Sequence, residues 1–210
     1  MRELDKILDD KEKVYWEGTP KFWPFFLGSS IVTTIFGLFW MMFLLPFLGI
    51  AIYNIFLGNP LIGFGIMLMP HFWIGLIFVF GVPIYQLLLY KHVYYAITDK
   101  RAIIQKGLIG RDFEILDFDK ITNAEVNMGV FDKLFGGTSG SILLSTAGTM
   151  TYNNGNAIQK PHTLRNIPDP YKVFKFFKKI SHDVKTDVHY PNKLRPKTNP
   201  GYKTKYKPKK

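Results

Sequence analysis

The feature that most constrains this sequence is a stretch of 69 residues, 22–90, that contains no Asp, Glu, Lys or Arg. Charged residues make up 20% of the whole chain, so a gap of this length would almost never arise by chance in a water-soluble domain. A helix crosses the hydrocarbon core of a bilayer with about 20 apolar residues. The stretch therefore predicts two membrane spans, or three with almost no loops. It is several times too long for the apolar region of a signal peptide.

Prolines and a glycine-containing turn divide this apolar stretch. The first span is expected at about residues 25–45, closed by Pro46, and the last at about residues 71–90, with a kink at Pro83. Between them, the turn-forming triplet Gly58-Asn59-Pro60 interrupts the apolar sequence. Three arrangements of this middle part remain open: two long, tilted spans that meet at the turn, a re-entrant or interfacial segment, or a third crossing.

Basic residues flank the apolar stretch on both sides and are absent within it. By the positive-inside rule, basic residues near span ends mark cytoplasmic flanks. Both flanks are therefore predicted to be cytoplasmic, which requires an even number of crossings, and two is the expected number. The chain is predicted to be a multi-pass cell-membrane protein with cytoplasmic N- and C-termini. The flanking residues are Lys6, Lys11, Lys13 and Lys21 before the stretch and Lys91, Lys100, Arg101, Lys106 and Arg111 after it.

Small residues recur every fourth position in the first span, at Ser29, Thr33 and Gly37. This spacing places them on one helix face, and small residues allow membrane helices to approach closely. The stripe predicts packing against the other span, a membrane protein partner or a second copy of the chain. Ionisable residues that would mark an ion or substrate pathway are absent from the spans, apart from His71 at a span end.

From residue 91 the pattern changes to the period of two that is typical of strands. The adjacent apolar residues Ile115 and Leu116 break this alternation and predict a bulge. Several short, regularly spaced strands predict an antiparallel sheet that closes into a small barrel or sandwich. The strands are expected at residues 92–98, 101–106, 112–118, 121–128, 141–146, 150–153 and 162–167.

A helix is expected after the last strand. Asp169 suits the N-cap position and Pro170 the first helical position. The helix would present one apolar stripe at the spacing i, i+3, i+4, i+7. The stripe consists of Val173, Phe176, Phe177 and Ile180.

Five short motifs then occur in order between about residues 10 and 182. They are Glu12–Pro20, Tyr95–Gly107 with its Thr98-Asp99-Lys100-Arg101 turn, Asp119-Lys120-Ile121, Phe131–Gly136 and Ile167-Pro168-Asp169-Pro170. This series resembles the bacterial pleckstrin-homology (PH) domain of YdbS-like membrane proteins. The resemblance implies a PH-like fold behind two membrane helices, but no particular activity, because one fold serves many functions.

The predicted fold class is therefore α+β: a two-helix transmembrane hairpin followed by a PH-like antiparallel β-barrel or sandwich, capped by a C-terminal α-helix. Four segments are expected. They are a cytoplasmic N-terminal segment (residues 1–21), the transmembrane region (22–90), the PH-like domain (91–183) and a disordered polybasic tail (184–210).

Two basic regions are candidates for contact with lipid headgroups or other anions. Lys100 and Arg101 follow Asp99 in a turn, although Asp99 could instead form the turn while the Arg101 stem packs on the sheet. The tail has no acidic residue from position 191 on, and each basic residue near an anionic membrane contributes about 1 kcal/mol. Membrane lipids are the predicted partner; nucleic acid or a purely solubilising role are the alternatives. The tail residues are Lys193, Arg195, Lys197, Lys203, Lys205, Lys207, Lys209 and Lys210.

No set of residues indicates catalysis. The chain has no cysteine, and its histidines lack the spacing of metal ligands. We therefore expect no enzyme, no cofactor and no metal, but a membrane-anchored module that binds protein or anionic lipid at the cytoplasmic face. The alternatives are an accessory or assembly subunit of a membrane complex, and a membrane-tethered tail that binds nucleic acid or the ribosome.

Overall fold

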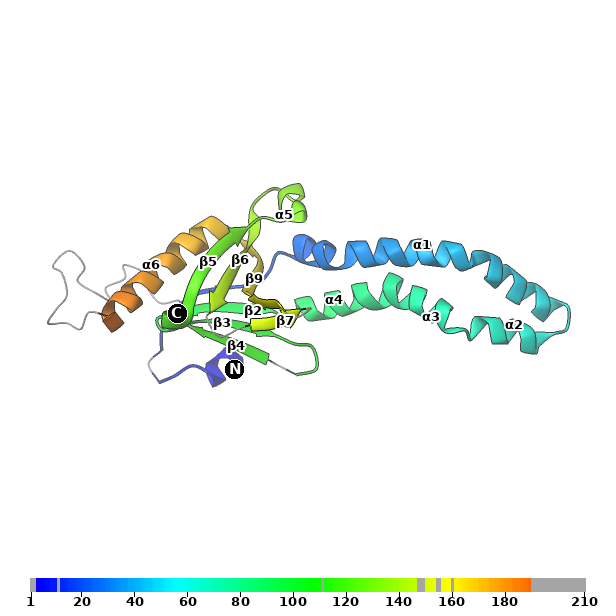
Figure 1. Ribbon diagram of the computed structural model, residues 1–210, viewed down its shortest axis with the longest axis horizontal. Helices are drawn as coiled ribbons and strands as arrows, with labels where there is room; N and C mark the ends of the chain where they lie inside the picture. The colour runs from blue at the N-terminus through cyan, green and yellow to red at the C-terminus, as the bar shows by residue number, and fades with distance from the viewer. Residues whose placement is uncertain are drawn as a thin grey trace. The chain divides into compact units, whose positions relative to one another are not determined.

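The computed structural model describes residues 3–10, 12–110, 112–146, 150–153, 156–159 and 161–189 (Figure 1). The chain folds as two compact units. The helical unit is Phe25–Lys91, and the sheet unit combines Met1–Pro24 with His92–Lys210. The N-terminal segment, which sequence analysis separated from the folded domain, is therefore part of it.

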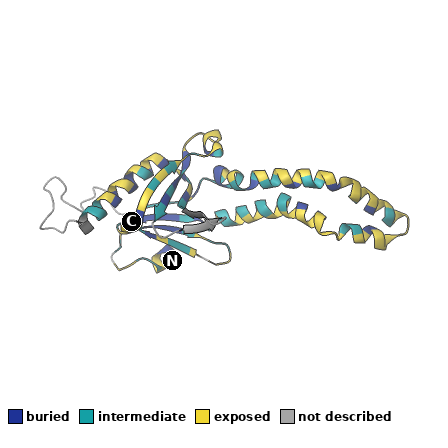
Figure 2. Ribbon diagram, in the orientation of Figure 1, coloured by how far each residue is buried: buried dark blue, intermediate teal, exposed yellow. Residues whose placement is uncertain are grey.

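Two long apolar helical runs form most of the helical unit. The first is α1 (Phe22–Phe56), and the second joins α3 (Pro70–Leu76), the π-helix η2 (Ile77–Gly81) and α4 (Val82–Tyr90), with Pro83 directly after the π-helical turn. Both runs are long and apolar enough to cross a membrane. Only 17% and 11% of their most apolar windows is buried, and Figure 2 shows both runs as largely exposed. A core helix of a water-soluble protein that is apolar all round would be buried instead.

The prediction that Pro46 closes the first span is wrong, because α1 continues through Pro46. Proline is tolerated inside membrane helices when other groups satisfy the backbone carbonyl that it leaves free. The predicted turn at Gly58-Asn59-Pro60 is confirmed, and Gly58 takes a φ of +82° that suits glycine. The next helix, α2 (Pro60–Met67), has eight residues and rises only about 12 Å, so it is too short to make a third crossing.

A glycine brings the two helical runs together. A Cβ added to Gly37 would lie 2.7 Å from Phe78 Cβ and 2.9 Å from Val79 Cγ2, so a larger residue would force the helices apart. Within the predicted stripe of Ser29, Thr33 and Gly37, Gly37 therefore contacts the other helical run of the same chain. The Thr33 hydroxyl donates to a carbonyl of its own helix at 2.8 Å.

The first sheet of the sheet unit has four antiparallel strands in the order β1-β2-β3-β4. They are β1 (Val14–Gly18), β2 (Tyr94–Thr98), β3 (Arg101–Lys106) and β4 (Asp112–Asp117). Sequence analysis did not predict β1. The bulge predicted at Ile115 and Leu116 is wrong, because β4 pairs with β3 without a shift in register. Leu116 is buried while Ile115 is exposed, which is ordinary strand alternation.

The remaining strands form two further antiparallel sheets instead of one closed sheet. The larger has the order β5-β6-β9 and the smaller pairs β7 with β8. The 3₁₀ turn η3 (Phe118–Lys120) leads into β5, and the short helix α5 lies between β5 and β6. The elements are β5 (Ile121–Asn127), α5 (Val130–Leu134), β6 (Ser139–Thr146), β7 (Met150–Asn153), β8 (Asn156–Gln159) and β9 (His162–Pro168).

The C-terminal helix α6 (Pro170–His189) begins where it was predicted. The backbone N–H groups of Lys172 and Val173 donate to the Asp169 carbonyl at 3.0 and 3.1 Å. The predicted apolar stripe is buried, and Phe177 packs edge-on against Phe118 at 5.5 Å between ring centroids. The α+β class with antiparallel sheets and a C-terminal helix is thus confirmed.

The N-terminal segment covers the outer face of the first sheet. Its 3₁₀ turn η1 (Glu3–Lys6) places Leu4, which is 2% exposed, in a cluster with Val14, Ala96 and Ile103. Because the other face of the sheet packs on the main core, β2 is buried on both sides. Burial on both faces accounts for the apolar residues at the successive positions Tyr95, Ala96 and Ile97.

Candidate functional site

The register of the first sheet defines two ends of the sheet unit. At one end Gly18 of β1 pairs with Tyr95 of β2. The chain leaves this end after Gly18 to form α1 and returns to it from α4 just before Tyr94. We call this the linker end. The opposite end, where Arg101 pairs with Asp117, is called the ion-pair end.

The second sheet shares these two ends. The Lys21 N–H, in the segment between β1 and α1, donates to the Asn166 carbonyl at 2.7 Å, and the Lys21 ammonium bonds the hydroxyl of Thr138. These contacts place the start of β6 and the end of β9 at the linker end, together with helix α5, which precedes β6 in the chain. At the ion-pair end, η3 joins Asp117 directly to Ile121, where β5 begins.

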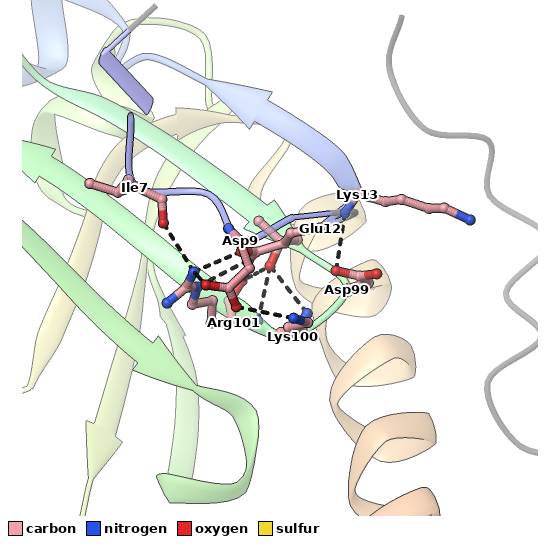
Figure 3. Close-up of polar contacts among 8 residues, drawn as sticks. Ile7, Asp9, Glu12, Lys13, Asp99, Lys100 and Arg101 are labelled. Carbon is pink, nitrogen blue, oxygen red and sulfur yellow. Dashed lines mark hydrogen bonds and ion pairs between the residues drawn. The ribbon is translucent and has the colours of Figure 1, made fainter. Parts of the chain in front are cut away.

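Four charged residues form an ion-pair cluster, defined as Asp9, Glu12, Lys100 and Arg101 (Figure 3). The Arg101 guanidinium donates to both Glu12 carboxylate oxygens, at 3.0 and 2.7 Å. Its Nη2 also donates to the Ile7 carbonyl at 3.1 Å. Lys100 Nζ donates to Asp9 at 3.0 Å. The fork of donors on Arg101 thus ties the N-terminal segment to the turn between β2 and β3.

The turn itself is held by backbone and side-chain bonds. The Thr98 hydroxyl oxygen accepts the N–H groups of Lys100 and Arg101, at 3.1 and 3.0 Å. Asp99 Oδ1 accepts the Lys13 N–H at 3.1 Å, and the Asp99 N–H donates to the Lys13 carbonyl at 3.0 Å. Asp99 therefore links the turn to the strand that precedes the membrane region.

The members of the cluster differ in their burial. The Arg101 side chain is 14% exposed and that of Glu12 is 0% exposed, whereas Lys100 and Asp9 are about half exposed. Burial raises the pKa of Glu12, but hydrogen bonds from Arg101 and Thr98 outweigh it and hold that pKa below 4.5. The hydrogen bond from Lys100, with the charge of Arg101, lowers the pKa of Asp9. The cluster is thus held by ionised carboxylates.

This pairing bears on the anion contact predicted for Lys100 and Arg101. Both cations have carboxylate partners within the chain, and the negative charge of Asp9 and Glu12 offsets theirs. They also lie at the ion-pair end, away from the segments that lead to the apolar helices. The arrangement favours the structural alternative, in which these residues fix the fold.

A basic groove lies between the edge strand β5 and helix α6. It has a volume of about 620 Å³. Its lining contains four basic or imidazole side chains, all from α6, and no carboxylate. The lining residues are Ile121, Thr122, Asn123, Ala124, Phe177, Lys178, Lys179, Ser181, His182 and Lys185. Sequence patterns could not place these side chains opposite β5, because the groove joins residues far apart in the chain.

A second groove, of about 580 Å³, lies between β1 and the first half of α6. Tyr15 and Phe176 meet there edge to face, 6.4 Å between ring centroids. Its charged lining residues are Asp169, Lys172 and Lys175, and Lys172 pairs with Asp169 at 3.6 Å. This groove is more nearly neutral than the first, so it offers less attraction to an anion.

A third charged group links the first sheet to β9 of the second sheet. Glu114 contacts the Lys106 ammonium and lies 2.9 Å from His162 Nδ1. Burial raises the pKa of Glu114, but hydrogen bonds from Lys106 and His162 produce a net lowering. In the part of the chain that the structure describes, no group of three or more His, Cys, Asp or Glu could hold a metal ion. The tail residues Lys193 to Lys210, predicted to contact anions, lie outside the described residues.

Comparison with known proteins assigns the family. The sequence profile described as "Bacterial PH domain" matches residues 31–180. The chain belongs to the bacterial PH domain family. This confirms the family predicted from the five sequence motifs.

Among solved structures, this bacterial PH domain protein is similar to a DUF1696 family protein with a pleckstrin-homology domain from Shewanella loihica PV-4. The two are 17% identical, the match covers 42% of this chain and 70% of that chain, and the TM-score is 0.29. No curated protein matches the chain.

Proposed function

We propose that this bacterial PH domain protein is a non-enzymatic interaction module, anchored in the cell membrane by α1 and the run from α3 to α4. In this proposal the basic groove between β5 and α6 receives an acidic segment of a partner protein at the cytoplasmic face. The observation that carries it is the groove lining, which collects Lys178, Lys179, His182 and Lys185 without a carboxylate.

Charge complementarity selects an acidic ligand. Lys178 and Lys179 are exposed on successive positions of α6, and His182 is exposed one turn later. The nearest carboxylate on β5, that of Glu125, accepts a hydrogen bond from Asn123 at 2.7 Å. Partially shielded lysines in a concave surface attract carboxylates more strongly than lysines on a flat, solvated surface, because the groove walls focus the field.

Strand geometry favours an extended segment as ligand. β5 is an edge strand, and an edge strand presents backbone groups that a peptide can pair with. Lys185 Nζ donates to the Ile121 carbonyl at 2.7 Å and so covers one end of this edge. A bound segment would therefore run along β5 from Thr122 onward, with its acidic side chains facing α6.

The position of the groove favours a protein over lipid headgroups. Helix α6 begins at the linker end, directly after Asp169, which follows β9. It extends about 30 Å over its 20 residues. Lys185, fifteen positions after Pro170, contacts Ile121 at the ion-pair end. The linkers to the apolar helices, residues 19–21 and 91–93, are short, so the linker end is the end of the sheet unit nearest the bilayer. Attraction between charges is screened beyond a Debye length of about 8 Å, which limits attraction between the bilayer surface and lysines toward the other end.

Binding of a model peptide tests the proposal. The probe is a fluorescein-labelled nonapeptide that alternates Glu with Val, titrated by anisotropy into the full-length protein in mild detergent. The Lys178→Glu/Lys179→Glu variant is expected to bind at least about tenfold more weakly, a change of about 1.4 kcal/mol. The matched control, Lys172→Glu/Lys175→Glu, makes the same charge change on the same helix but lines the other groove, and should bind as the parent does.

Two outcomes would contradict the proposal. Equal weakening in both variants would mean that the peptide senses only net charge. Displacement of the peptide by phosphatidylglycerol in the micelles, with no such effect of phosphatidylcholine, would assign the groove to lipid headgroups. The assembly-subunit alternative would require a partner on another part of the helices, because Gly37 packs against Phe78 and Val79 of the same chain.

A further inference from the structure

Large apolar side chains gather on the surface of the sheet unit at α5. Val130 is 78% exposed, Leu134 71% and Phe135 38%. A helix of five residues buries little by itself; here Val130 and Leu134 face outward and Phe131 is half-buried, while the one carboxylate, Asp132, is buried. This is the reverse of the pattern expected in water, and exposed apolar groups of this size mark a surface that something else covers.

The α5 segment is joined by contact to the first turn of α1. The Trp23 indole stacks on the Phe135 ring, with centroids 6.1 Å apart and planes at 14°. Phe22 in turn meets Trp23 edge to face at 5.1 Å. Both Phe22 and Trp23 belong to the helix that is long and apolar enough to span a membrane. Phe135 therefore lies against the start of that helix.

A buried carboxylate holds this segment in shape. Asp132, 2% exposed, accepts hydrogen bonds from the Gly129 N–H at 3.0 Å, the Ser139 hydroxyl at 2.6 Å and the Asn166 side-chain amide at 3.0 Å. The Gly137 N–H donates to the Asp132 carbonyl at 2.9 Å. A carboxylate with several hydrogen bonds fixes its surroundings, so Val130 and Leu134 stay outside the core instead of folding onto it.

The charges around α5 match an anionic lipid surface. Lys133 is exposed on α5, and the Lys21 ammonium bonds Thr138, which follows α5 in the chain. Within residues 129–137 the only acidic side chain is the buried Asp132. Apolar side chains bordered by lysine, with tryptophan at the boundary, are the features of segments that lie in the membrane interface.

A second apolar point lies at the same end of the sheet unit. The loop between β3 and β4 closes after the pair Lys106–Asp112 at the linker end. Its residue Ile109 is 101% exposed. The exposed apolar residues of α5 and of the β3–β4 loop thus lie at the same end of the domain, next to the two chain segments that lead to the apolar helices. Their position indicates one surface that faces the same apolar medium.

We propose that α5 and the β3–β4 loop dip into the headgroup layer of the leaflet where α1 begins, and that the occupant of this surface is the lipid bilayer itself. Leu134, Val130 and Ile109 are the inserting side chains. The sheet unit is then held against the membrane at points beyond its two covalent linkers. This inference rests on α1 as a membrane span and is independent of the β5–α6 groove.

Depth measurements on single-cysteine variants test this inference. Because the chain has no cysteine, Leu134→Cys and Ile109→Cys each provide one labelling site for the fluorophore NBD. The full-length protein is reconstituted in phosphatidylcholine–phosphatidylglycerol vesicles that contain lipids spin-labelled near the headgroup. The control is Lys120→Cys, an exposed position at the ion-pair end.

Spin-labelled lipid is expected to quench the labels at positions 134 and 109 at least twofold, and the label at position 120 hardly at all. Aqueous iodide should quench in the reverse order. Equal iodide quenching at positions 134 and 120, with no quenching by lipid, would overturn the proposal. Shielding at position 134 that occurs in native membranes but not in pure lipid vesicles would also overturn it, in favour of a protein occupant.

Discussion

The two ends of the sheet unit differ in which side chains they expose and which they bury, although the same strands form both ends. At the linker end, apolar side chains such as Leu134 and Ile109 face outward and the one carboxylate of α5 is buried. At the ion-pair end, apolar side chains such as Phe118 are buried, and the charges of Glu12 and Arg101 meet each other. The exposed apolar groups of the linker end suit contact with a medium less polar than water. The ion-pair end has the buried apolar groups and paired charges expected of a surface in water.

The difference bears on the anion contact predicted for Lys100 and Arg101. A basic turn close in sequence to a membrane span predicts headgroup contact, and Lys100 and Arg101 have that composition. The register instead places them at the end opposite to the linkers, with Asp9 and Glu12 as partners. The segment best suited to meet lipid is α5, which carries a single lysine.

The largest expected effect is at the linker end, on replacing Asp132 with alanine. The change leaves the Ser139 hydroxyl and the Asn166 amide without their acceptor in a buried position. Asp132→Ala is therefore expected to lower the free energy of unfolding of the sheet unit by about 3 kcal/mol. Hydrogen exchange of the β2 amides, in full-length protein in detergent micelles, measures this loss.

The matched control for that variant is Asp112→Ala, which removes an exposed aspartate from the same end. It should change the free energy by less than about 0.5 kcal/mol. If the amides of both variants exchange hydrogen at the rate of the parent, the hydrogen bonds of Asp132 do not hold α5. The claim that they keep the exposed apolar residues outside the core would then be wrong.

The ion-pair end should respond to loss of Arg101 by a somewhat smaller amount. Arg101→Ala leaves the Glu12 carboxylate, which is 0% exposed, without its guanidinium partner. The expected cost is about 2 kcal/mol, since removing one member of a buried pair leaves an uncompensated charge. The same exchange measurement reports it. Lys100→Ala, which removes an exposed member of the cluster, should leave exchange unchanged.

A double-mutant cycle separates the pair from general damage. When Glu12→Ala is added to Arg101→Ala, the second change should cost much less than it does alone, because the carboxylate that had lost its partner is gone. Additive losses would mean that the two residues stabilise the domain independently of each other.

Local sequence patterns predicted much of this fold because they report local burial. Alternation along the chain located β5, and the stripe on α6 was found because its four apolar residues bury against one core. The prediction failed at β1, which pairs with a strand that follows the whole apolar stretch. A charge-rich segment gives little local sign of such a partner.

The candidate sites were less accessible to prediction than the fold. Lys100 and Asp9 are 91 positions apart, and Arg101 and Glu12 are 89 apart, so no spacing rule connects them. The basic groove likewise requires β5 and α6 to be placed together. Some signal for the N-terminal cover was present: Leu4, Ile7 and Leu8 recur at helical spacing among the charges of the first segment.

Acid should destabilise the sheet unit through Glu12 and Glu114. The pKa values of Glu12 and Glu114 lie below their ordinary value of 4.5 in the folded protein, so the unfolded chain binds more protons in acid. Their contribution is fully present above about pH 5.5 and is lost as pH falls through the lowered pKa values. Exchange of the β2 amides should therefore be constant from pH 7 to 5.5, after correction for intrinsic rates, and rise below pH 4.5.

Arg101→Ala provides the comparison for this pH profile. Without the guanidinium, burial is expected to dominate and raise the pKa of Glu12, so stability should depend less on pH below 4.5. A variant whose acid profile matches that of the parent would show that Glu12 is not responsible for the loss.

The smallest effect is expected at the most exposed apolar position of α5, and it separates folding from membrane contact. Leu134, 71% exposed, contributes little to the core, so Leu134→Ser should change the free energy of unfolding in detergent by less than about 0.5 kcal/mol. Leu116→Ser, at a residue 2% exposed on β4, makes the same chemical change and should cost about 3 kcal/mol. If Leu134→Ser destabilises the sheet unit as much as Leu116→Ser does, then α5 is part of the core, and its apolar side chains need no bilayer to explain them.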